Sequence, residues 1–510
     1  MKKVIYNTCV ADPWVKVAQT LNDEYGWKPV YWTGFGEDHS EVVVPQAFPD
    51  IVYQPYYEAW RGVFPAEISE KYAESYIDID FLKKFAVYEV QALKMMDRLD
   101  YDRYSFNFME RERHFLNLIK HWTACIRFFK PDVVISAVNP HRVYDYVLYL
   151  LCKFHGIKYI TFQYTMCSER FYAVTDIFSI GDVFKKDYEF YLSQKQLKID
   201  TLPEEVRTQY QKVMADYSIA APSYMRTHPV LHKKNSNFLF LAKRLFTTNK
   251  FFGKEGLLSK GVSRTVYKNK KYSIENAHFS VWDFALKRRR TFLYNKMMEK
   301  YYMSKTSLPD YEVPYIMFFP HYQPEETTSP NGDIFVNQRL CIETLLKHSP
   351  ENYYVYIKEH PHQFMSHMQG HTSRIKEFYD DLAAYPRVKL IPFEIDSYTL
   401  IRHAVAISTV TGTVGWEAMV QQKPVIIFGI IWYEKYTGVL RITDEESASK
   451  MMSFIDHFQY DENNLLAYLH AFSKNSVRAY HYPGEKERLN VSEKECVDSL
   501  VQETLNAFNR

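Results

Sequence analysis

Apolar runs of strand length alternate with segments of helical periodicity along the first 230 residues of the chain. The segments 81–99 and 142–156 carry apolar side chains at helical spacing, and Gly156 stands where the second helix would end. The apolar runs that we expect to form strands, each bounded by polar residues or proline, are 4–7, 29–32, 133–137 and 159–163. Strands that alternate with helices predict a parallel sheet covered by helices.

The same alternation returns after about residue 314, with helices expected near 337–347 and 373–384, from Ser397, and from about Thr413. The strands expected in this half are 315–320, 353–359, 388–393, 404–408 and 424–429. The last seventy residues have the pattern of helices. The fold class that we predict is α/β, with two Rossmann-like domains whose parallel sheets face each other across a cleft.

The chain of 510 residues is long enough for two or three domains. We predict an N-terminal, acceptor-side Rossmann-like domain (1–230), a basic and aromatic-rich helical insertion or linker (231–305), a C-terminal Rossmann-like domain (306–470) and C-terminal helices that pack back on the N-terminal domain (471–510). Open parallel sheets bind ligands at the carboxyl ends of their strands, so a cleft between two such domains is the expected site.

The composition, 46% hydrophobic and 24% charged, is that of a folded protein. Six cysteines lie far apart without a Cys-x-x-Cys pair, which is typical of buried thiols in a reducing compartment. The N-terminus has the pattern of a first strand and not of a signal peptide, and no apolar run approaches the roughly 18 residues of a membrane span. We therefore expect a cytoplasmic protein.

Charge is unevenly distributed. Residues 231–300 hold 17 Lys and Arg against 4 Asp and Glu, interspersed with Phe, Trp and Leu, although the net charge of the whole chain is only +2. A solvated helical face or linker, a surface that binds an anionic membrane, and a nucleic-acid site all fit this composition. No recognised nucleic-acid motif accompanies the segment, so we expect no nucleic-acid partner.

The stretch STVTGTVGWEA (408–418) is small and hydroxyl-rich where a strand gives way to a helix. Unpaired backbone N–H groups and the positive end of the helix dipole converge at such a turn, so an anion can bind there. Glu417, one turn into the helix, is placed to accept hydrogen bonds from sugar hydroxyls. The residues expected at the anion are Ser408, Thr409, Thr411, Gly412 and Thr413. A helix cap with close strand–helix packing is the alternative interpretation.

A second motif, YIKEHPH (356–362), places Lys358 and His360 at the end of a predicted strand, where both can donate to a phosphate oxygen. Metal binding is a rival interpretation, because His360, His362, His367 and His371 have suitable spacings. No carboxylate or cysteine completes that set, so we expect no metal.

The third motif is the loop PHYQPEETTSP (320–330), which presents His321, Gln323, Glu325, Glu326 and Thr327 after a predicted strand. A carboxylate here can act as a general base or stabilise positive charge. The alternative is a surface loop whose acidic pair is merely solvated.

In the N-terminal half, NPHRVYDY (139–146) also runs from a strand to a helix. His141 and Asp145 are candidates to orient or deprotonate an acceptor hydroxyl, whereas Asn139 and Pro140 could instead start the helix. The Asp-x-Asp pattern of IDID (77–80) occurs in metal-dependent sugar transferases, but Asp80 is better explained as a helix N-cap.

KEHP (358–361), followed by STVTGTVGWEA and KPVIIFG (423–429), resembles the second domain of GT-B glycosyltransferases. It is most similar to the capsule polysaccharide biosynthesis family, which includes bacterial Kdo transferases and is distantly similar to bacterial polysialyltransferases. The PHYQPEETTSP loop also resembles a signature of capsule-family proteins. The resemblance covers about 315–430 and is only architectural in the N-terminal half.

The resemblance implies a nucleotide-sugar donor, a CMP-linked sugar being one candidate, and a glycan or lipid-linked glycan acceptor of a bacterial surface polysaccharide such as capsule or lipopolysaccharide. It places His360, Ser408, Thr409 and Thr411 at the donor phosphate, Glu417 at the ribose, and a catalytic acidic group at Glu325. Lys358, Gln323, Gly412 and Thr413 complete the expected donor site. Several Kdo transferases carry a further acidic residue where this chain has Thr327.

We therefore predict a transferase that needs no metal and no cofactor. Residues 231–300 are a candidate for its peripheral attachment to the inner face of the bacterial inner membrane. Two alternatives stay open: a sugar-nucleotide epimerase or polyol-phosphate transferase of similar fold, and a non-catalytic glycan-binding assembly protein.

Overall fold

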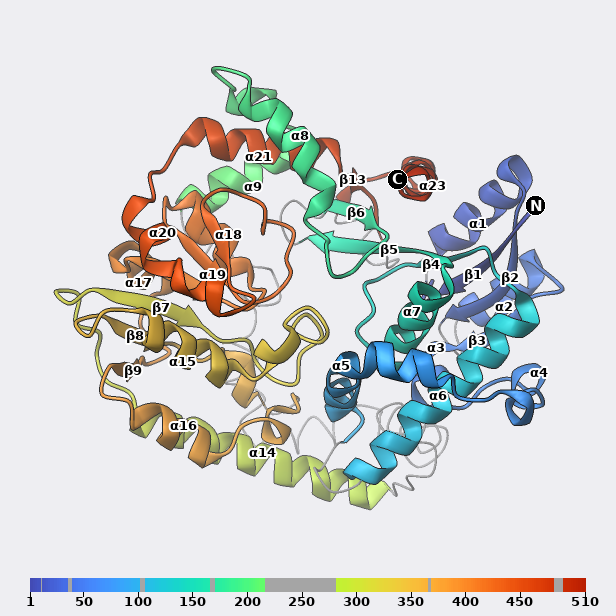
Figure 1. Cartoon of the computed structure of the whole chain (residues 1–510), viewed down its shortest axis with the longest axis horizontal. Helices are drawn as coiled ribbons and strands as arrows, with labels where there is room; N and C mark the ends of the chain where they lie inside the picture. Colours follow the sequence, from blue (N-terminus) through green and yellow to red (C-terminus); the bar gives the residue numbers. More distant parts are fainter. Residues whose placement is uncertain are drawn as a thin grey trace, which may run out of the picture. The chain divides into compact units, whose positions relative to one another are not determined.

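The computed structural model describes residues 1–10, 12–34, 39–100, 106–165, 170–215, 281–365, 368–480 and 489–510. The chain divides into two compact units, each built on one sheet (Figure 1). Unit 1 comprises Met1–Met96, Phe106–Val206 and Leu466–Arg510, and unit 2 comprises Asp97–Ser105 and Arg207–Leu465.

Unit 1 contains a seven-stranded sheet in the order β13-β6-β5-β4-β1-β2-β3 (Figure 1). Its strands are β1 (Lys2–Asn7), β2 (Trp27–Gly34), β3 (Val52–Pro55), β4 (Val133–Ser136), β5 (Lys158–Thr165), β6 (Arg170–Val174) and β13 (Val477–Arg478). The five strands from β3 to β5 are parallel, and β6 and β13 extend one edge in antiparallel fashion. Chain order reverses between β1 and β4, which is the switch point of a doubly wound sheet.

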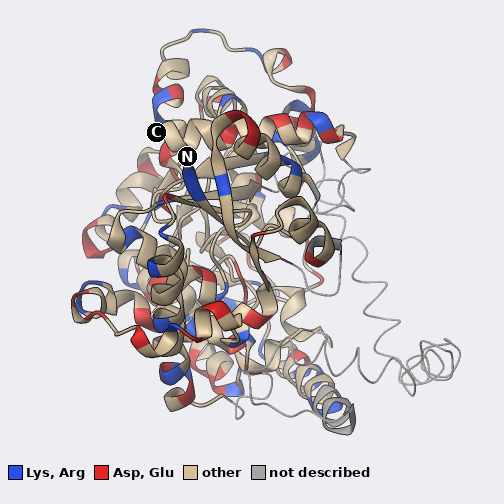
Figure 2. Cartoon of the chain, turned by 90° about the vertical axis from the view of Figure 1, so that its right-hand side faces the viewer, with Lys and Arg blue, Asp and Glu red and all other residues tan. Residues whose placement is uncertain are grey.

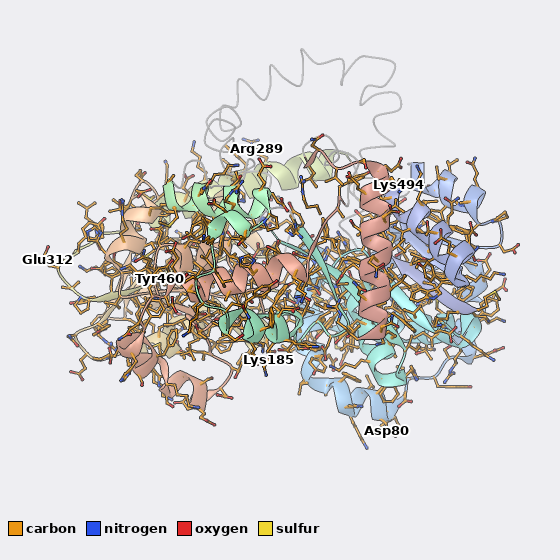
Figure 3. All side chains as sticks on the ribbon, turned by 90° about the horizontal axis from the view of Figure 1, so that it is seen from above. Asp80, Lys185, Arg289, Glu312, Tyr460 and Lys494 are labelled. Carbon is orange, nitrogen blue, oxygen red and sulfur yellow. The ribbon has the colours of Figure 1, made fainter. Side chains whose placement is uncertain are left out.

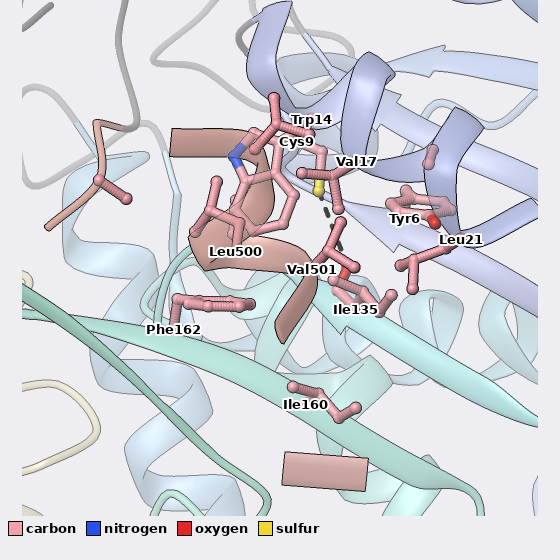
Figure 4. Packing of buried hydrophobic residues seen from close by; sticks show 14 of the residues in the cluster. Tyr6, Cys9, Trp14, Val17, Leu21, Ile135, Ile160, Phe162, Leu500 and Val501 are labelled. Carbon is pink, nitrogen blue, oxygen red and sulfur yellow. Dashed lines mark hydrogen bonds between the residues drawn. The ribbon is translucent and has the colours of Figure 1, made fainter. Parts of the chain in front are cut away.

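Helices cover this sheet, and the last of them closes its core. The main helices are α1 (Asp12–Tyr25), α2 (His39–Ala47), α3 (Tyr56–Arg61), α4 (Ala66–Ser69), α5 (Ile79–Met95), α6 (Phe108–Phe129), α7 (Val143–His155), α8 (Asp182–Leu192) and α23 (Glu493–Asn509). Helix α9 (Glu204–Ala215) begins in unit 1 and lies mostly in unit 2. In Figure 4, Leu500 and Val501 of α23 lie in the same buried cluster as Trp14 of α1 and Phe162 of β5. The C-terminal helix thus buries apolar surface contributed by the N-terminal strands and helices.

Unit 2 contains six strands that are all parallel, in the order β12-β11-β10-β7-β8-β9. They are β7 (Tyr315–Phe319), β8 (Tyr354–Ile357), β9 (Val388–Leu390), β10 (Ala406–Thr409), β11 (Val425–Ile427) and β12 (Val439–Arg441). Its helices include α14 (Val281–Ser304), α15 (Gln338–His348), α16 (Lys376–Ala383), α17 (Ser397–His403), α18 (Thr413–Val420), α19 (Glu445–Ser449), α20 (Met451–His457) and α21 (Glu462–Lys474), the last of which continues into unit 1. The switch point lies between β7 and β10, so the loops that follow these two strands define the expected ligand site.

The end of the basic segment is a core helix of unit 2. Met298 and Tyr302 of α14 are buried in the main apolar cluster, and the Tyr302 hydroxyl donates to the carbonyl of Ile391 at 2.6 Å. The opposite face of α14, where Figure 3 labels Arg289, is solvated. Residues 231–280, which hold most of the predicted insertion, lie outside the described residues.

The predicted α/β fold class, with two sheets dominated by parallel strands, is confirmed. The strands β3, β6, β12 and β13 were missed by the sequence pattern, and β13 lies in the last seventy residues, which were predicted to be helical. The N-cap of α5 is Asp78, which accepts from the backbone N–H of Phe81, so the prediction of Asp80 as the cap was wrong. Asp80 instead points outward from the start of the helix (Figure 3).

Lys and Arg residues are interspersed with Asp and Glu residues along the described ribbon (Figure 2). Among the helices formed by the described residues, none has both the length and the apolar composition needed to span a bilayer. The cleft between the two units stays a prediction.

Candidate active site at the switch point of unit 2

One imidazole connects the two loops that meet at the switch point. The backbone N–H of Thr411, in the turn between β10 and α18, donates to His321 Nε2 at 3.0 Å. The other ring nitrogen, Nδ1, lies 2.5 Å from Glu325 Oε2. His321 follows β7 and is buried, and the Glu325 side chain is only 17% exposed. The arrangement therefore fixes a carboxylate and a helix-starting turn relative to each other.

These contacts define the protonation of the ring. Nε2 must offer a lone pair to accept the Thr411 N–H, so the proton of the imidazole resides on Nδ1 and is donated to Glu325. The hydroxyls of Thr411 and Thr409 lie 3.4 and 3.5 Å from the same Nε2. His321 is thus neutral and bound on both sides.

Glu325 is held in its ionised form. Burial by itself raises the pKa of this carboxyl, but the hydrogen bonds that it accepts from the His321 ring and from Thr327 help to bring the pKa below its ordinary value. A carboxylate that stays ionised near neutral pH can accept a proton.

The turn between β10 and α18 has the features of an anion site. Gly412 is the N-cap of α18 and provides no capping side chain, and Thr413 is exposed at the first helical position. A Cβ on Gly412 would lie 2.6 Å from Thr409 Oγ1, and one on Gly415 would lie 2.2 Å from the Tyr433 hydroxyl oxygen. The glycines therefore serve close packing, as the alternative interpretation held, and they also leave the helix N-terminus uncovered.

Two further residues of the predicted phosphate site lie deeper. Thr409 is buried and donates its hydroxyl to the carbonyl of Phe319 at 3.0 Å, which joins β10 to β7. Ser408 is fully buried on the strand face shared with Ala406 and Val410, both members of the core cluster. Its hydroxyl has no hydrogen-bond partner among the described residues.

Glu417 of α18 is buried, and this burial raises the pKa of its carboxyl to about 7. Burial is the main cause that raises the pKa of the Tyr433 phenol, and the nearby Glu417 carboxyl raises that pKa further. A carboxyl with this pKa is partly protonated at neutral pH and can both donate to and accept from a hydroxyl.

His360 and Lys358 follow β8, at the neighbouring strand end. The His362 backbone N–H donates to His360 Nδ1 at 3.1 Å, at the start of the short 3-10 helix η5 (Pro361–Phe364). The neutral ring then carries its proton on Nε2, which is a hydrogen-bond donor. Lys358 instead donates to the carbonyl of Ile395 at 2.6 Å and to Ser397 Oγ at 2.9 Å. Burial lowers the Lys358 pKa to about 8, against the opposing effect of Asp396 and Glu394.

A buried ion pair supports both histidine loops. Arg374 Nε donates to Glu359 Oε2 at 2.9 Å, and the two side chains are 5% and 2% exposed. The same carboxylate accepts from the His360 backbone N–H at 3.1 Å, through Oε1, and from the Tyr379 hydroxyl at 2.9 Å. Arg374 Nη2 also donates to the carbonyl of His321 at 3.3 Å. One charge pair therefore ties the β8 loop to the β7 loop.

Gln323 and Glu326 form hydrogen bonds and an ion pair with other residues of unit 2. The Gln323 side chain donates to Thr328 Oγ1 at 2.8 Å, and its backbone exchanges hydrogen bonds with the Gln363 amide. Glu326 is paired with Arg98 at 2.9 Å, from a segment far away in the sequence. Sequence analysis noted His321 without assigning it a role, and it missed Arg98 and Arg374, for which no motif gives a signal.

In unit 1, Asp145 accepts the backbone N–H groups of Arg142 and His141 at 2.8 and 3.3 Å, so it caps the start of α7. Burial raises the pKa of this carboxyl, against the opposing effects of the Arg142 charge and of the two backbone hydrogen bonds that the carboxylate accepts. His141 Nδ1 lies 2.7 Å from the carbonyl of Asn139, which places the proton of the neutral ring on Nδ1 and a lone pair on Nε2. The N-cap residue is Arg142, so the alternative of Asn139 as the cap is wrong.

No group of three or more His, Cys, Asp or Glu side chains in the described part of the chain could hold a metal ion. His367, one member of the rival metal set, lies outside the described residues.

Replacing Arg374 with Met should lower the free energy of unfolding by about 3–5 kcal/mol, because Glu359 would remain buried without its countercharge. Urea unfolding followed by tryptophan fluorescence measures this. The matched control is Arg339→Met, which removes the solvent-accessible pairings of Arg339 with Glu343 and Asp381 and should cost at most about 1 kcal/mol. Equal effects of the two substitutions would contradict the conclusion that Arg374 compensates the buried charge of Glu359.

Residues 332–457 match the sequence model of a family described as capsule polysaccharide biosynthesis protein. A search of curated protein sequences gave no match. Among solved structures, KpsC of Thermosulfurimonas dismutans, as a β-Kdo 2,7 transferase, is 17% identical, with 44% of this chain and 66% of that chain covered and a TM-score of 0.23.

The β-Kdo 2,4 transferase of the same KpsC is 15% identical, with 36% of this chain and 54% of that chain covered and a TM-score of 0.21. UDP-GlcNAc 2-epimerase from Methanocaldococcus jannaschii is 12% identical, with 91% and 95% covered and a TM-score of 0.25. The chain thus spans 66% and 54% of the two transferase chains. The resemblance found in the sequence is confirmed: over residues 332–457, the chain is similar to the capsule polysaccharide biosynthesis family.

Proposed function

We propose that this chain is a glycosyltransferase of capsule polysaccharide assembly, which moves a sugar from a nucleotide-sugar donor to a growing bacterial surface glycan. The observation that carries the proposal is the family match over residues 332–457, which contains both His360 and the β10–α18 turn. The position of that turn at the switch point of a parallel sheet supports it, because such sheets bind their ligands there.

In this proposal the donor phosphate binds at the N-terminus of α18. The amides of Gly412 and Thr413 and the Nε2–H of His360 stabilise the negative charge that develops on the leaving nucleotide. Glu417 contacts the ribose hydroxyls. Lys358, which donates to the Ile395 carbonyl and to Ser397, contributes positive charge near the site. Ser408 is buried in the core and contributes packing beneath the turn.

The transfer step follows from these placements. The bond between the anomeric carbon and the phosphate oxygen breaks, and its electron pair leaves with the nucleotide. The acceptor oxygen bonds to that carbon, and its proton passes to the ionised Glu325 carboxylate. His141, held by the Asp145 cap, is the acceptor-side residue of unit 1 in this scheme.

We also propose that the solvated face of α14 attaches the protein to an anionic membrane, where lipid-linked acceptors lie. Leu293 and Met297 are 53% and 38% exposed on this helix. The cationic residues exposed with them are Arg289, Arg290, Lys296 and Lys300. Exposed apolar side chains flanked by cations suit a headgroup surface.

A panel of CMP-, UDP-, GDP- and CDP-linked sugars tests the function, with nucleotide release and acceptor extension followed by mass spectrometry. We expect one donor class to support release together with glycan extension. Interconversion of the sugar without extension would instead support an epimerase. Glycan binding without turnover of any donor would support an assembly protein, and either result would refute the transferase.

His360→Asn should lower kcat/KM by about 100-fold, because it shortens the donor aimed at the phosphate. Asn keeps an acceptor for the His362 N–H, so the cap of η5 and the melting temperature should be retained. His403→Asn, on the exposed end of α17, is the matched control and should leave turnover unchanged. Near-normal turnover of the His360 variant would remove His360 from the site.

Replacing Arg289, Arg290, Lys296 and Lys300 with Gln should weaken binding to phosphatidylglycerol vesicles at least about tenfold, because each cation near an anionic surface contributes roughly 1 kcal/mol. Co-sedimentation measures binding, and activity on a soluble acceptor should persist. The control replaces four exposed lysines elsewhere, Lys16, Lys347, Lys450 and Lys494, with Gln. The same loss in both variants would show a general charge effect and no docking face.

A further inference from the structure

We infer that His321 is a positioning residue of the proposed reaction: its neutral imidazole holds the Glu325 carboxylate and the Thr411 end of the β10–α18 turn in one geometry, and it exchanges no proton with the substrate. This inference rests on the proposed function, because it assigns Glu325 to the acceptor proton and the turn to the donor phosphate.

The hydrogen bonds of the ring support this role. His321 Nδ1–H is committed to Glu325 at 2.5 Å, and Nε2 is committed to the Thr411 N–H at 3.0 Å. A proton placed on Nε2 would remove the acceptor that the buried Thr411 N–H uses, and an unpaired buried donor is costly. The ring is therefore stable only as the Nδ1–H tautomer.

The backbone of His321 is fixed as firmly as its ring. Its carbonyl accepts from Gln338 Nε2 at 3.0 Å and from Arg374 Nη2 at 3.3 Å. Arg374 is itself held by the buried Glu359. Hydrogen bonds thus define both the position and the orientation of the imidazole, as expected of a residue that sets the distance between two others.

The ionisation of Glu325 depends on few neighbours. The titratable groups that face it are His321 from its own loop and His360 from the loop after β8. Glu326, the next residue along, is paired with Arg98. Removing the His321 donor would leave burial as the main effect on the Glu325 pKa and would raise that pKa.

The proposal has a matched pair of variants, because Asn and Gln each reproduce one half of the ring. An Asn amide reaches the position of Nδ1 and keeps a donor for Glu325, whereas a Gln amide reaches the position of Nε2 and keeps an acceptor for Thr411. His321→Asn should raise the KM for the donor by about tenfold, since the turn loses its anchor. The acid limb of its pH–rate profile should stay in place.

His321→Gln should show the opposite pattern, with the donor KM retained and the acid limb of kcat/KM shifted to higher pH, because Glu325 would protonate more readily. His321→Ala should combine both defects and lose about 100-fold in kcat/KM. If the Ala variant fails to fold, the Asn and Gln variants carry the comparison. An equal loss of kcat in all variants with KM unchanged would overturn the proposal, because it would indicate proton transfer by His321.

The tautomer is measured independently of any turnover. Nitrogen-15 chemical shifts of the imidazole signals that disappear in His321→Gln report which nitrogen carries the proton between pH 6 and 8. A persistent Nδ1–H tautomer supports the inference, and an Nε2–H or doubly protonated ring refutes it. If the wild-type protein transfers no sugar from any donor, the proposed function fails, and this measurement still decides how His321 joins Glu325 to Thr411.

Discussion

The hydrogen bond from the Thr411 N–H to His321 connects the two halves of a sheet whose chain order reverses at that point. A parallel strand pair leaves its two following loops free to diverge, because one runs to a helix on one side and the other to a helix on the opposite side. In unit 2 the loop after β7 is long and rich in polar residues, so its path depends on side-chain contacts. The bond to Thr411, with the Thr409 hydroxyl on the Phe319 carbonyl, keeps this loop at the strand ends.

Beneath the loops, Glu359 and Arg374 form a charge pair in the interior. Burying two charges costs several kcal/mol of desolvation each, and their attraction offsets this only when the remaining hydrogen-bonding groups are satisfied. Here Glu359 also accepts from the Tyr379 hydroxyl and the His360 N–H, while Arg374 reaches the His321 carbonyl. An apolar pair could fill the same volume but could not hold two backbone segments by hydrogen bonds. The pair therefore supports the geometry of the site more than the stability of the unit.

Much of unit 2 could be predicted from the sequence, because every strand except β12 lies in a short apolar run that ends at a polar loop. The predicted run 315–320 corresponds to β7, and His360 lies at a strand end as expected. Side-chain direction was harder to predict. Ser408 lies one residue before Thr409, and in a strand this single step turns its side chain into the core. Arg374 lies in a loop without periodicity, so its contact with Glu359 depends on tertiary packing that local patterns do not encode.

Two carboxyl groups of unit 2 meet opposite environments. Glu325 accepts hydrogen bonds from His321 and Thr327, and its pKa falls below the ordinary value. Glu417 is buried on an apolar helix, and its pKa rises to about 7. When neighbouring environments separate two pKa values in this way, one group is fitted to accept a proton and the other to share hydrogen bonds as a partly neutral acid. In the reaction proposed above, Glu325 is therefore suited to accept the proton of the acceptor hydroxyl. Glu417, which would avoid a second full negative charge near the proposed anionic donor, is suited to contact sugar hydroxyls.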